Sequence, residues 1–382
     1  MPQLQVQYII SLKIFYKRVD FIILTGITAE FNPLHKGHEL LFSKIKNPDG
    51  IIVVLSSNFT QRGSPSISDK LTRADNAVIA GADLVLELPF LYSCSAAQDF
   101  SRGAVNILGR LGFVEQIAFG MEDVNFDAHK LVSIMINEPE NYKTVLKHEM
   151  SLGASFPKAN SIALENILNG SGDFIKKPNN LLAVSYMLNV KKQGFNIEFF
   201  PVKRTGNFKS SLIRENIIEN SDMLPDYSLQ SLNNNTLYNE GKLWPLLQCL
   251  FIRSSVDELR EIYGIDEGIE GLFLKNWKAS KNLGDFIGKC VCSRYTRAHI
   301  RRRLIYILLG LKRADVKEAM NGNVPYTRVL AFNRKGREIL RKYKKYSQIP
   351  IISRLKDIKT EKGKYFARTE NKASQLYSLI KC

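Results

Sequence analysis

The chain has 382 residues, of which 45% are apolar, so it is long enough for two domains with sizeable cores and is not a disordered protein. No apolar run approaches the roughly 20 residues that a membrane helix needs. The formal net charge of +17 is unevenly distributed along the chain. Residues 1–240 hold 23 Lys and Arg against 24 Asp and Glu, while residues 241–382 hold 31 against 13. This distribution predicts a neutral module joined to one that binds a polyanion.

Residues 1–20 mix apolar and basic side chains without the apolar core or cleavage site of a signal peptide, and we interpret them as a leader of uncertain status. The five cysteines are scattered, and Cys290 and Cys292 have no second pair that would complete a zinc site. An odd number of cysteines without a secretory signal favours reduced thiols and a cytoplasmic protein. We expect no dedicated metal site.

From residue 21 onward, apolar runs typical of strands alternate with helical patterns. Strands are predicted at 21–27, 51–56, 83–88, 116–120 and 195–202, and helices at 38–46, 69–80 (capped by Ser68), 96–111 and 180–192, with a helical insertion at about 125–170. This alternation predicts an α/β domain over residues 21–220, with a Rossmann-like parallel sheet that binds ligands at the carboxyl ends of its strands.

A polar, broken stretch at 221–245 marks the predicted domain boundary. Beyond it, helical patterns cover 246–253, 256–263, 286–292, 293–311 and 313–320, followed by a β-like piece at 326–332 and a basic helix at 335–346. We therefore predict a second domain over residues 221–382 that is basic and mostly α-helical.

The turn after the first strand carries two histidines, His35 and His38, on either side of Gly37. A strand, an Asn-Pro turn and a helix start in this order place unpaired backbone N–H groups and the positive end of a helix dipole where an anion can bind. Imidazole donors at that point stabilise the charge that develops on an α-phosphate. We interpret the turn as an ATP-handling site with catalytic histidines, although two surface histidines at a helix start would share this pattern.

A second phosphate clamp is predicted at Ser210-Ser211-Leu212-Ile213-Arg214, where hydroxyl groups at the start of a helix over 212–220 precede an arginine. Ser211 and Arg214 would hold the outgoing pyrophosphate, and Arg204 in the preceding loop can serve the same phosphates. Together with the histidine turn, this motif resembles the late Ser/Thr-x-Ile-Arg motif of the nucleotidyltransferase superfamily.

Two other regions offer groups to a ligand. The loop at 56–65 presents Asn58, Gln61 and Arg62 to a small anion or a base edge. Gly120 ends a strand, where a missing side chain would admit adenine or ribose. Asn179 and Asn180 precede a helix, where they either cap the helix or read adenine, and capping is the better interpretation on physical grounds alone.

Basic side chains alternate with tyrosines in the last third, a pattern suited to phosphate contacts and base stacking. RNA is favoured over DNA because no module that reads a DNA groove is visible. Three of the arginines, at 294, 297 and 301, are predicted to share one helix face. The candidate RNA contacts are Arg294, Arg297, Arg301, Arg302, Lys335 and Arg337.

Several blocks of sequence resemble, in order, those of the bacterial tRNA(Met) cytidine acetate ligase family, over about residues 22–345. They are GITAEFNPLHKGHELL, LSSNFTQRGSPS, GADLVLELP, AFGME, KPNNLLAVSY, SSLIR, RAHIRRRLIYILLG and RVLAFNRKGRE. The resemblance implies a nucleotidyltransferase fold, with ATP (and Mg²⁺ on its phosphates) and acetate giving acetyl-adenylate and pyrophosphate. The acetyl group would then pass to N4 of the wobble cytidine of elongator methionine tRNA, with no membrane or DNA partner.

The family's ATP-binding residues carry over to matching positions of this chain, namely Gly120, Asn179 with its neighbour Asn180, Arg204, and a loop. The loop comprises Thr28, Ala29, Glu30, Phe31, Asn32, Pro33, Leu34, His35, Lys36, Gly37, His38, Glu39, Leu40 and Leu41. The loop at 57–65 would help to place acetate or cytidine. The sequence departs from the family pattern in two places. The leader has no counterpart in the family, and Met121 stands where the family pattern has serine.

Two other functions are open to this sequence. One is a small-molecule adenylyltransferase acting on a phosphorylated cofactor precursor, although such enzymes rarely carry a strongly basic helical domain. The other is an RNA-binding protein with an inactive nucleotide fold, against which the intact pair of histidines argues.

Overall fold

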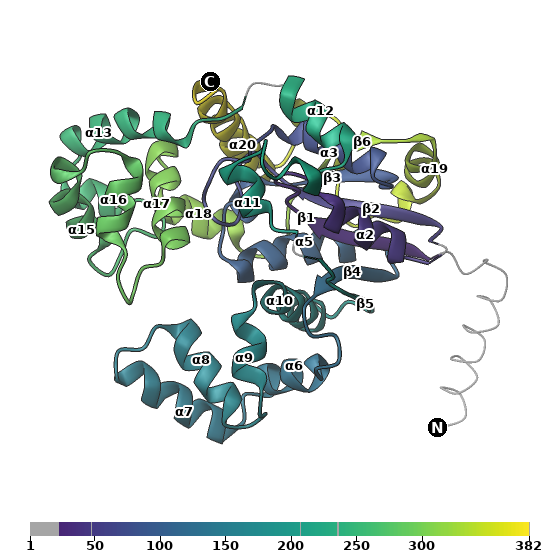
Figure 1. Cartoon of the computed structure of the whole chain (residues 1–382), viewed down its shortest axis with the longest axis horizontal. Coiled ribbons are helices and arrows are strands. Elements are labelled where there is room, and N and C mark those ends of the chain that lie inside the picture. Colours follow the sequence, from purple (N-terminus) through teal and green to yellow (C-terminus); the bar gives the residue numbers. More distant parts are fainter. Residues whose placement is uncertain (1–22, 47, 207, 235–236, 382) are drawn as a thin grey trace.

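The computed structural model describes residues 23–46, 48–206, 208–234 and 237–381, so the predicted leader at 1–20 lies outside the described residues. Within these residues a seven-stranded sheet has the order β5-β4-β1-β2-β3-β6-β7 (Figure 1). The first five strands run parallel, whereas β6 is antiparallel to β3. The strands are β1 (Leu24–Ala29), β2 (Gly50–Ser56), β3 (Leu84–Leu88), β4 (Gln116–Met121), β5 (Glu198–Lys203), β6 (Thr327–Phe332) and β7 (Ile351–Ile352).

The helices fall into three groups along the chain. Those of the sheet layer and its insertion are α2 (Lys36–Lys44), α3 (Lys70–Ile79), α4 (Phe90–Ser93), α5 (Ala97–Leu111), α6 (Ala128–Asn137), α7 (Glu140–Ser151), α8 (Phe156–Glu165), α9 (Ser171–Lys176), α10 (Pro178–Lys192) and α11 (Ser210–Glu215). Next come α12 (Asp226–Asn234), α13 (Leu243–Arg253), α14 (Val256–Arg260), α15 (Ile269–Asn276), α16 (Leu283–Cys290), α17 (Arg297–Leu309) and α18 (Arg313–Met320). The last are α19 (Arg334–Tyr343) and α20 (Glu361–Leu379).

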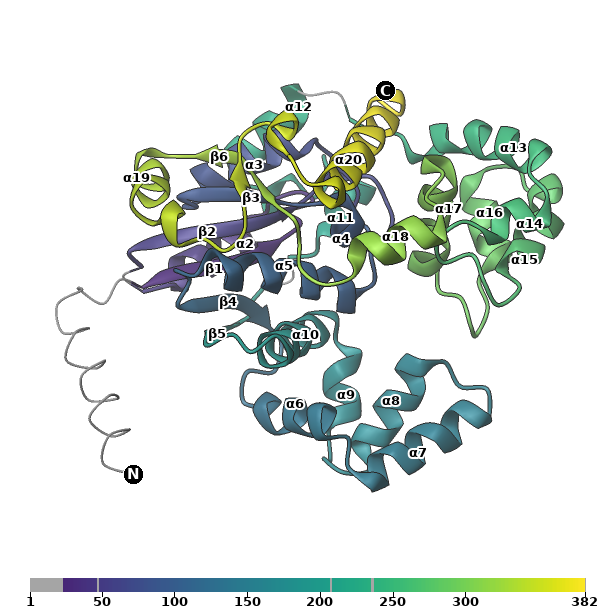
Figure 2. The same ribbon diagram turned by 180° about the vertical axis from the view of Figure 1, so that it is seen from behind.

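Strand β2 is buried on both faces, as its uninterrupted apolar run predicts. Ile52 and Val54 belong to the core on the α5 side of the sheet, while Ile51 and Val53 pack on the opposite side with α2 and α3. Figures 1 and 2 show these two helical layers from opposite sides. The parallel α/β fold predicted from the alternating pattern is therefore confirmed.

The order of the strands creates a crevice beside β1. The chain builds β1, β2 and β3 in one direction and then crosses back to place β4 on the other side of β1. At such a switch point the loops after the two neighbouring strands diverge, and ligands of α/β proteins bind there. The histidine turn follows β1 directly, so the topology places it at this crevice.

Two groups of helices extend from the sheet layer (Figure 1). Helices α6 to α9 lie together below α10, and α6, α7 and α8 occupy the stretch predicted as a helical insertion. Helices α13 to α17 form a lobe at the other side, which we call the helical lobe. No helix in the described part of the chain is long and apolar enough to cross a membrane.

The assignment of all residues of 221–382 to a helical domain differs from the structure. Strands β6 and β7 extend the sheet beyond β3, and α20 packs on α4. Arg328 of β6 forms two hydrogen bonds of 2.8 and 2.9 Å with the buried carboxylate of Glu87 in β3. The end of the chain therefore returns to the sheet, because these long-range charge pairs and the free edge of β3 attract it.

Two local predictions are also corrected. Asp69, rather than Ser68, caps α3, since its carboxylate accepts the backbone N–H groups of Leu71 and Thr72 at 2.9 and 3.1 Å. Helix α11 spans Ser210–Glu215 instead of 212–220, so both serines lie in its first turn.

Candidate active site

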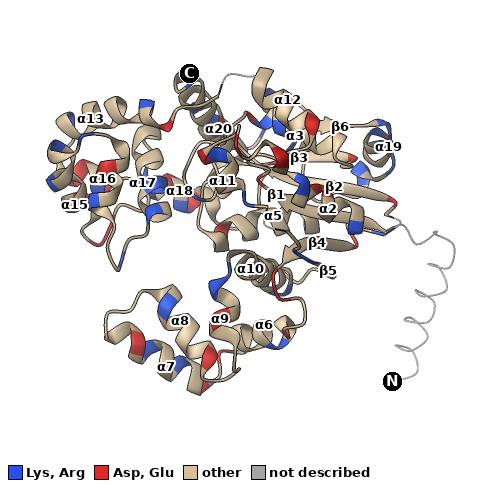
Figure 3. Ribbon diagram, in the orientation of Figure 1, with Lys and Arg blue, Asp and Glu red and all other residues tan. Residues whose placement is uncertain are grey.

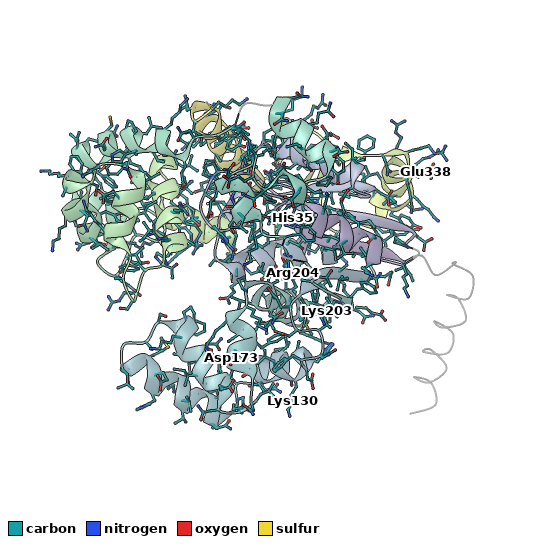
Figure 4. The ribbon with its side chains drawn as sticks, viewed as in Figure 1. His35, Lys130, Asp173, Lys203, Arg204 and Glu338 are labelled. Carbon is teal, nitrogen blue, oxygen red and sulfur yellow. The ribbon has the colours of Figure 1, made fainter. Side chains whose placement is uncertain are left out.

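A cavity of about 650 Å³ opens at the carboxyl ends of β1 and β4. Its walls come from the histidine turn, the loop after β2, the start of α10 and the segment that joins β5 to α11. Figure 4 labels His35, Lys203 and Arg204 in this central region, whereas Lys130, Asp173 and Glu338 mark outlying helices. Such a volume is typical of a cleft for a nucleotide-sized ligand.

The two histidines of the turn lie against each other at the start of α2. Their rings stack with centroids 3.7 Å apart and planes inclined by 15°. The backbone N–H of His35 donates to Nδ1 of His38 at 3.1 Å, and the N–H of His38 donates to the carbonyl of His35 at 2.7 Å. Phe31, whose φ is +46°, packs its ring edge-on against His38 at 4.9 Å. The turn thus holds both imidazoles in fixed orientations.

Both imidazoles are neutral at pH 7. Burial, assisted by the charge of Arg204, lowers the pKa of His35 to about 4. Burial also lowers the pKa of His38 well below its usual value, with further contributions from His35 and Arg204. Because Nδ1 of His38 accepts a hydrogen bond, its proton lies on Nε2, which makes that atom a donor.

Two buried polar atoms in the cavity wall have no partner among the described residues. They are Nδ1 of His35 and the hydroxyl of Thr28. Unpaired buried polar atoms are rare in folded proteins because each loses its hydration without compensation. Their presence indicates that a polar ligand completes this site.

Two glycines allow close approach of the chain around the cavity. A Cβ atom on Gly37 would lie 3.1 Å from the ring of His35 and 3.1 Å from Cβ of Phe208. A Cβ atom on Gly120 would lie 3.2 Å from Cγ of Arg204. The space beside Gly120 is therefore partly filled by the stem of Arg204, which the sequence did not indicate.

The cavity wall is strongly cationic. Arg214 donates to the carbonyl of Asn32 at 2.5 Å, which ties α11 to the histidine turn. Arg204 donates to the carbonyl of Phe208 at 3.2 Å, and Ser211 lines the same wall. The cationic side chains of the wall are Arg62, Lys203, Arg204, Lys209 and Arg214. A polyphosphate would be attracted to this arrangement.

Most of the predicted loop lines the cavity, but four of its members do not. Leu34 is 1% exposed and packs in the apolar core on the α2 side, and Pro33 beside it is buried. Lys36 is exposed away from the cavity, and Glu39 accepts the hydroxyl of Tyr227 at 3.0 Å. The residues that do line it are Thr28, Ala29, Glu30, Phe31, Asn32, His35, Gly37, His38, Leu40 and Leu41.

Two predicted asparagines serve the fold instead. Asn180 is fully buried, and its amide oxygen accepts the N–H of Glu122 at 2.8 Å while its NH₂ group donates to Asp123 at 2.6 Å. Asn58 accepts the N–H of Lys70 at 2.9 Å. Neither side chain lines the cavity, whereas Asn179, Gln61 and Arg62 do. The predicted ligand contacts of these two asparagines are therefore corrected, because both side chains hold neighbouring segments of the chain outside the cavity wall.

The sequence did not single out several residues of the cavity wall. Aromatic and aliphatic side chains form its apolar part, namely Phe100, Phe119, Leu181, Leu182, Tyr186 and Phe208. Lys203 and Lys209 also line it. The lysines adjoin predicted residues and could have been found from that neighbourhood, whereas the apolar residues look like ordinary core positions in the sequence.

The predicted RNA contacts do not form one surface. Arg294 precedes α17, which begins after the N-cap Thr296, so it shares no helix face with Arg297; both are exposed. Arg301 pairs with Glu240 at 3.0 Å, and the buried Arg302 donates to the carbonyl of Gln61 at 2.8 Å. Lys335 and Arg337 lie on α19, at the far side of the sheet from α17 (Figure 3).

A parallel sheet whose switch point carries a His-x-Gly-His turn and a cationic cavity defines a nucleotidyl transferase. The family described as HIGH Nucleotidyl Transferase matches residues 23–382 of the chain. Within this class, the chain belongs to the tRNA(Met) cytidine acetate ligase family. It is 35% identical to the tRNA(Met) cytidine acetate ligase of Clostridium perfringens, covering 94% of this chain and 95% of the relative. It is 34% identical to that of a Thermoanaerobacter species, covering 88% and 90%.

Solved structures agree with this membership. Thermotoga maritima TmcAL bound with alpha-thio ATP superimposes with a TM-score of 0.86 at 28% identity, covering 94% of this chain and 95% of that one. Its apo form gives a TM-score of 0.87. The α/β fold expected from the resemblance is therefore confirmed over nearly the whole chain.

Proposed function

We propose that this protein activates acetate with ATP and transfers the acetyl group to N4 of the wobble cytidine of elongator tRNA(Met). Family membership supports the reaction, and the cavity supports its chemistry. The observation that carries the proposal is the pair of stacked, neutral imidazoles at the switch point, with the unpartnered Nδ1 of His35 in the cavity wall. The site fits ATP, since orphaned donors and a cationic wall meet at one crevice.

In the first step a carboxylate oxygen of acetate attacks the α-phosphorus of ATP, and the bond to pyrophosphate breaks. Nε2–H of His38 donates to the oxygens that gain charge, with the proton on His35 available in the same stack. Arg214 and Ser211 hold the leaving pyrophosphate, and Arg204 and Lys203 balance the remaining phosphate charge. Gly120 and Asn179, which line the same cavity, would seat the nucleoside.

In the second step N4 of cytidine attacks the acetyl carbon, and the bond to the AMP phosphate oxygen breaks. N4 loses one proton, and the products are N4-acetylcytidine and AMP. Gln61 and Arg62 of the loop after β2 line the cavity beside the turn and help to place acetate or the acceptor base. Asn58 is left out of this role because it does not line the cavity and its amide oxygen accepts the backbone N–H of Lys70.

A magnesium ion would accompany the ATP phosphates. Over the described ranges, no group of three or more His, Cys, Asp or Glu side chains could hold a metal ion. The ion would therefore be bound chiefly by the phosphates themselves, which suits Mg²⁺ because it usually keeps several waters. We place the reaction in the cytoplasm, where tRNA is modified.

The RNA would approach over the start of α17, where Arg294 and Arg297 are exposed. Arg301 lies one turn further along the helix and is half-buried by its pair with Glu240. The loop after β2 touches the same helix, so a bound RNA would lie next to the cavity.

A direct assay tests the proposal. Protein, ATP, labelled acetate and bulk tRNA are mixed, and acid-stable label is measured on tRNA and located by nuclease digestion. We expect label as N4-acetylcytidine in methionine tRNA alone. Label that appears only on a small phosphorylated molecule, or tRNA binding without ATP turnover, would overturn it.

A further inference from the structure

Glu30 is a carboxylate in a wall that otherwise attracts phosphates. It follows the last residue of β1 and lines the cavity together with five cationic side chains. A negative charge in a triphosphate site opposes binding of the nucleotide. Its presence in this wall is therefore better explained by a second substrate, one that presents hydrogen-bond donors.

One oxygen of Glu30 is free for such a substrate. Oε1 accepts the backbone N–H of Gln61 at 2.7 Å, while Oε2 has no partner among the described residues. The other carboxylate of the wall, Glu122, is saturated by the NH₂ group of Asn179 at 2.6 Å and the N–H of Asn180 at 2.9 Å. Among the described residues of the wall, Glu30 is thus the acid with a free acceptor.

Glu30 lies on the side of the cavity that faces the helical lobe. Strand β1 separates β4, which carries Gly120, from β2, whose following loop carries Gln61. In that loop Gly63 contacts α17 so closely that a Cβ atom would lie 2.4 Å from the backbone nitrogen of Arg302. Gln61, whose N–H donates to Glu30 and whose carbonyl accepts from Arg302, therefore links Glu30 directly to α17.

We propose that Glu30 identifies the acceptor base by its amino group and accepts the proton that this group releases. The inference rests on the proposed function. Cytidine presents two N4–H donors where uridine presents the O4 acceptor, so a carboxylate oxygen binds the former and repels the latter. As the N4–carbon bond forms and the bond between acyl carbon and phosphate oxygen breaks, one N4 proton passes to Oε2 of Glu30 and AMP leaves.

The surroundings of Glu30 suit a proton acceptor. Burial raises its pKa, opposed by the N–H of Gln61 and by the guanidinium groups of Arg73, Arg62 and Arg214. Tyr186 of α10, whose hydroxyl stays protonated, also faces it. A carboxylate with a raised pKa is a stronger base while it is still ionised at pH 7.

Glu30→Gln separates this role from a structural one. The amide oxygen still accepts the N–H of Gln61, while the NH₂ group replaces the free acceptor. We expect the unfolding midpoint to stay near the wild-type value and acetyl transfer from preformed acetyl-adenylate to fall by about 10²–10⁴-fold, a larger loss than that of acetate-dependent ATP–pyrophosphate exchange. In competition assays the variant should lose the preference of the wild type for tRNA with cytidine over tRNA with uridine at the wobble position.

Each outcome decides the inference. Acetyl transfer by Glu30→Gln within threefold of wild type, or exchange and transfer lost to the same extent, would overturn it. On the wild type, transfer from preformed acetyl-adenylate should slow as the pH falls from 8 to 4, and a constant rate would also overturn it. If the wild-type protein forms no labelled tRNA, the proposed function itself is wrong. That outcome is distinguishable because it is measured on the wild type alone, without the Glu30→Gln variant.

Discussion

The imidazole of His35 lies stacked on that of His38, 3.7 Å from centroid to centroid. Two imidazolium rings at this distance would repel each other, and burial lowers the pKa of both groups so that neither is charged at pH 7. The stack therefore provides neutral donors to a transition state without drawing the nucleotide in by charge. That attraction comes from the cationic side chains around it.

Replacing His38 should remove activation of acetate and leave RNA binding in place. We expect His38→Ala to lower ATP–pyrophosphate exchange by about 10²–10³-fold, the usual loss for a donor to a developing oxyanion. Affinity for tRNA, measured by filter binding, should change less than threefold. His148→Ala, which alters an exposed residue of α7, serves as the control. A collapse of tRNA affinity in His38→Ala would contradict this role.

Stability should fall on acidification because of His35. Its folded pKa is about 4, against 6.5 for the unfolded chain, so between these values only the unfolded chain binds the proton. The free energy of unfolding therefore decreases as pH falls through this window, by about 1.4 kcal/mol per unit at most. We expect His35→Asn to show a shallower decrease than wild type in urea unfolding at pH 7.5, 6 and 5. Equal decreases in the free energy of unfolding of the two proteins would contradict this role of His35.

The sequence predicts the central strands well because β2 carries an uninterrupted apolar run, β3 is apolar except for Glu87, and the histidine turn follows β1. It does not predict that β6 joins β3, since Arg328 and Glu87 meet only through tertiary folding. Helix α20 was likewise missed, and its buried Glu370 faces groups far away in the sequence. In the site, spacing locates the histidines, whereas the saturation of Asn180 depends on contacts with Glu122 that spacing cannot show.

Neighbouring arginines of α17 should have separable roles. Arg302 is buried and holds the carbonyl of Gln61, whereas Arg297 is exposed. We expect Arg302→Ala to raise the KM for acetate by tenfold or more, with little change in tRNA affinity. Arg297→Ala should weaken tRNA binding, reduce its salt slope by about 1, and leave exchange unchanged. If both variants lose tRNA affinity equally, Arg302 contacts RNA after all.

The buried charge of Glu370 should stabilise the return of α20 to the sheet. Its carboxylate contacts the ammonium group of Lys70 and accepts the hydroxyl of Ser57 at 2.5 Å and the N–H of Phe90 at 2.8 Å. Removing one partner of a buried pair typically destabilises by about 3–5 kcal/mol when the other charge is left unpaired. Because Lys70 keeps a second buried partner in Glu87, we expect Glu370→Ala to destabilise the protein in urea unfolding by less than that range. Glu361→Ala, at an exposed pair with Lys364 on the same helix, should leave the midpoint unchanged. Equal midpoints for the two variants would refute the assignment.

Gly63 should be required for both the loop after β2 and its contact with α17. Its φ is +75°, and an added Cβ would lie 2.4 Å from the backbone nitrogen of Arg302 and 2.8 Å from the carbonyl carbon of Arg301. Backbone atoms cannot move aside as a flexible side chain does, so Gly63→Ala should displace the loop that carries Gln61. We expect acetyl transfer to fall more than tenfold.

Gly153→Ala is the matched control for this displacement. Gly153 has a φ of +83° but nothing within 4 Å of an added Cβ, so the control measures backbone strain alone, about 1–2 kcal/mol. Gly63→Ala should lose more stability than this in urea unfolding, and its loss of transfer should exceed its loss of tRNA affinity, because the loop lines the cavity while Arg297 remains in place. Equal losses of stability together with unchanged transfer would show that the loop accommodates the methyl group, and that its contact with α17 does not position Gln61.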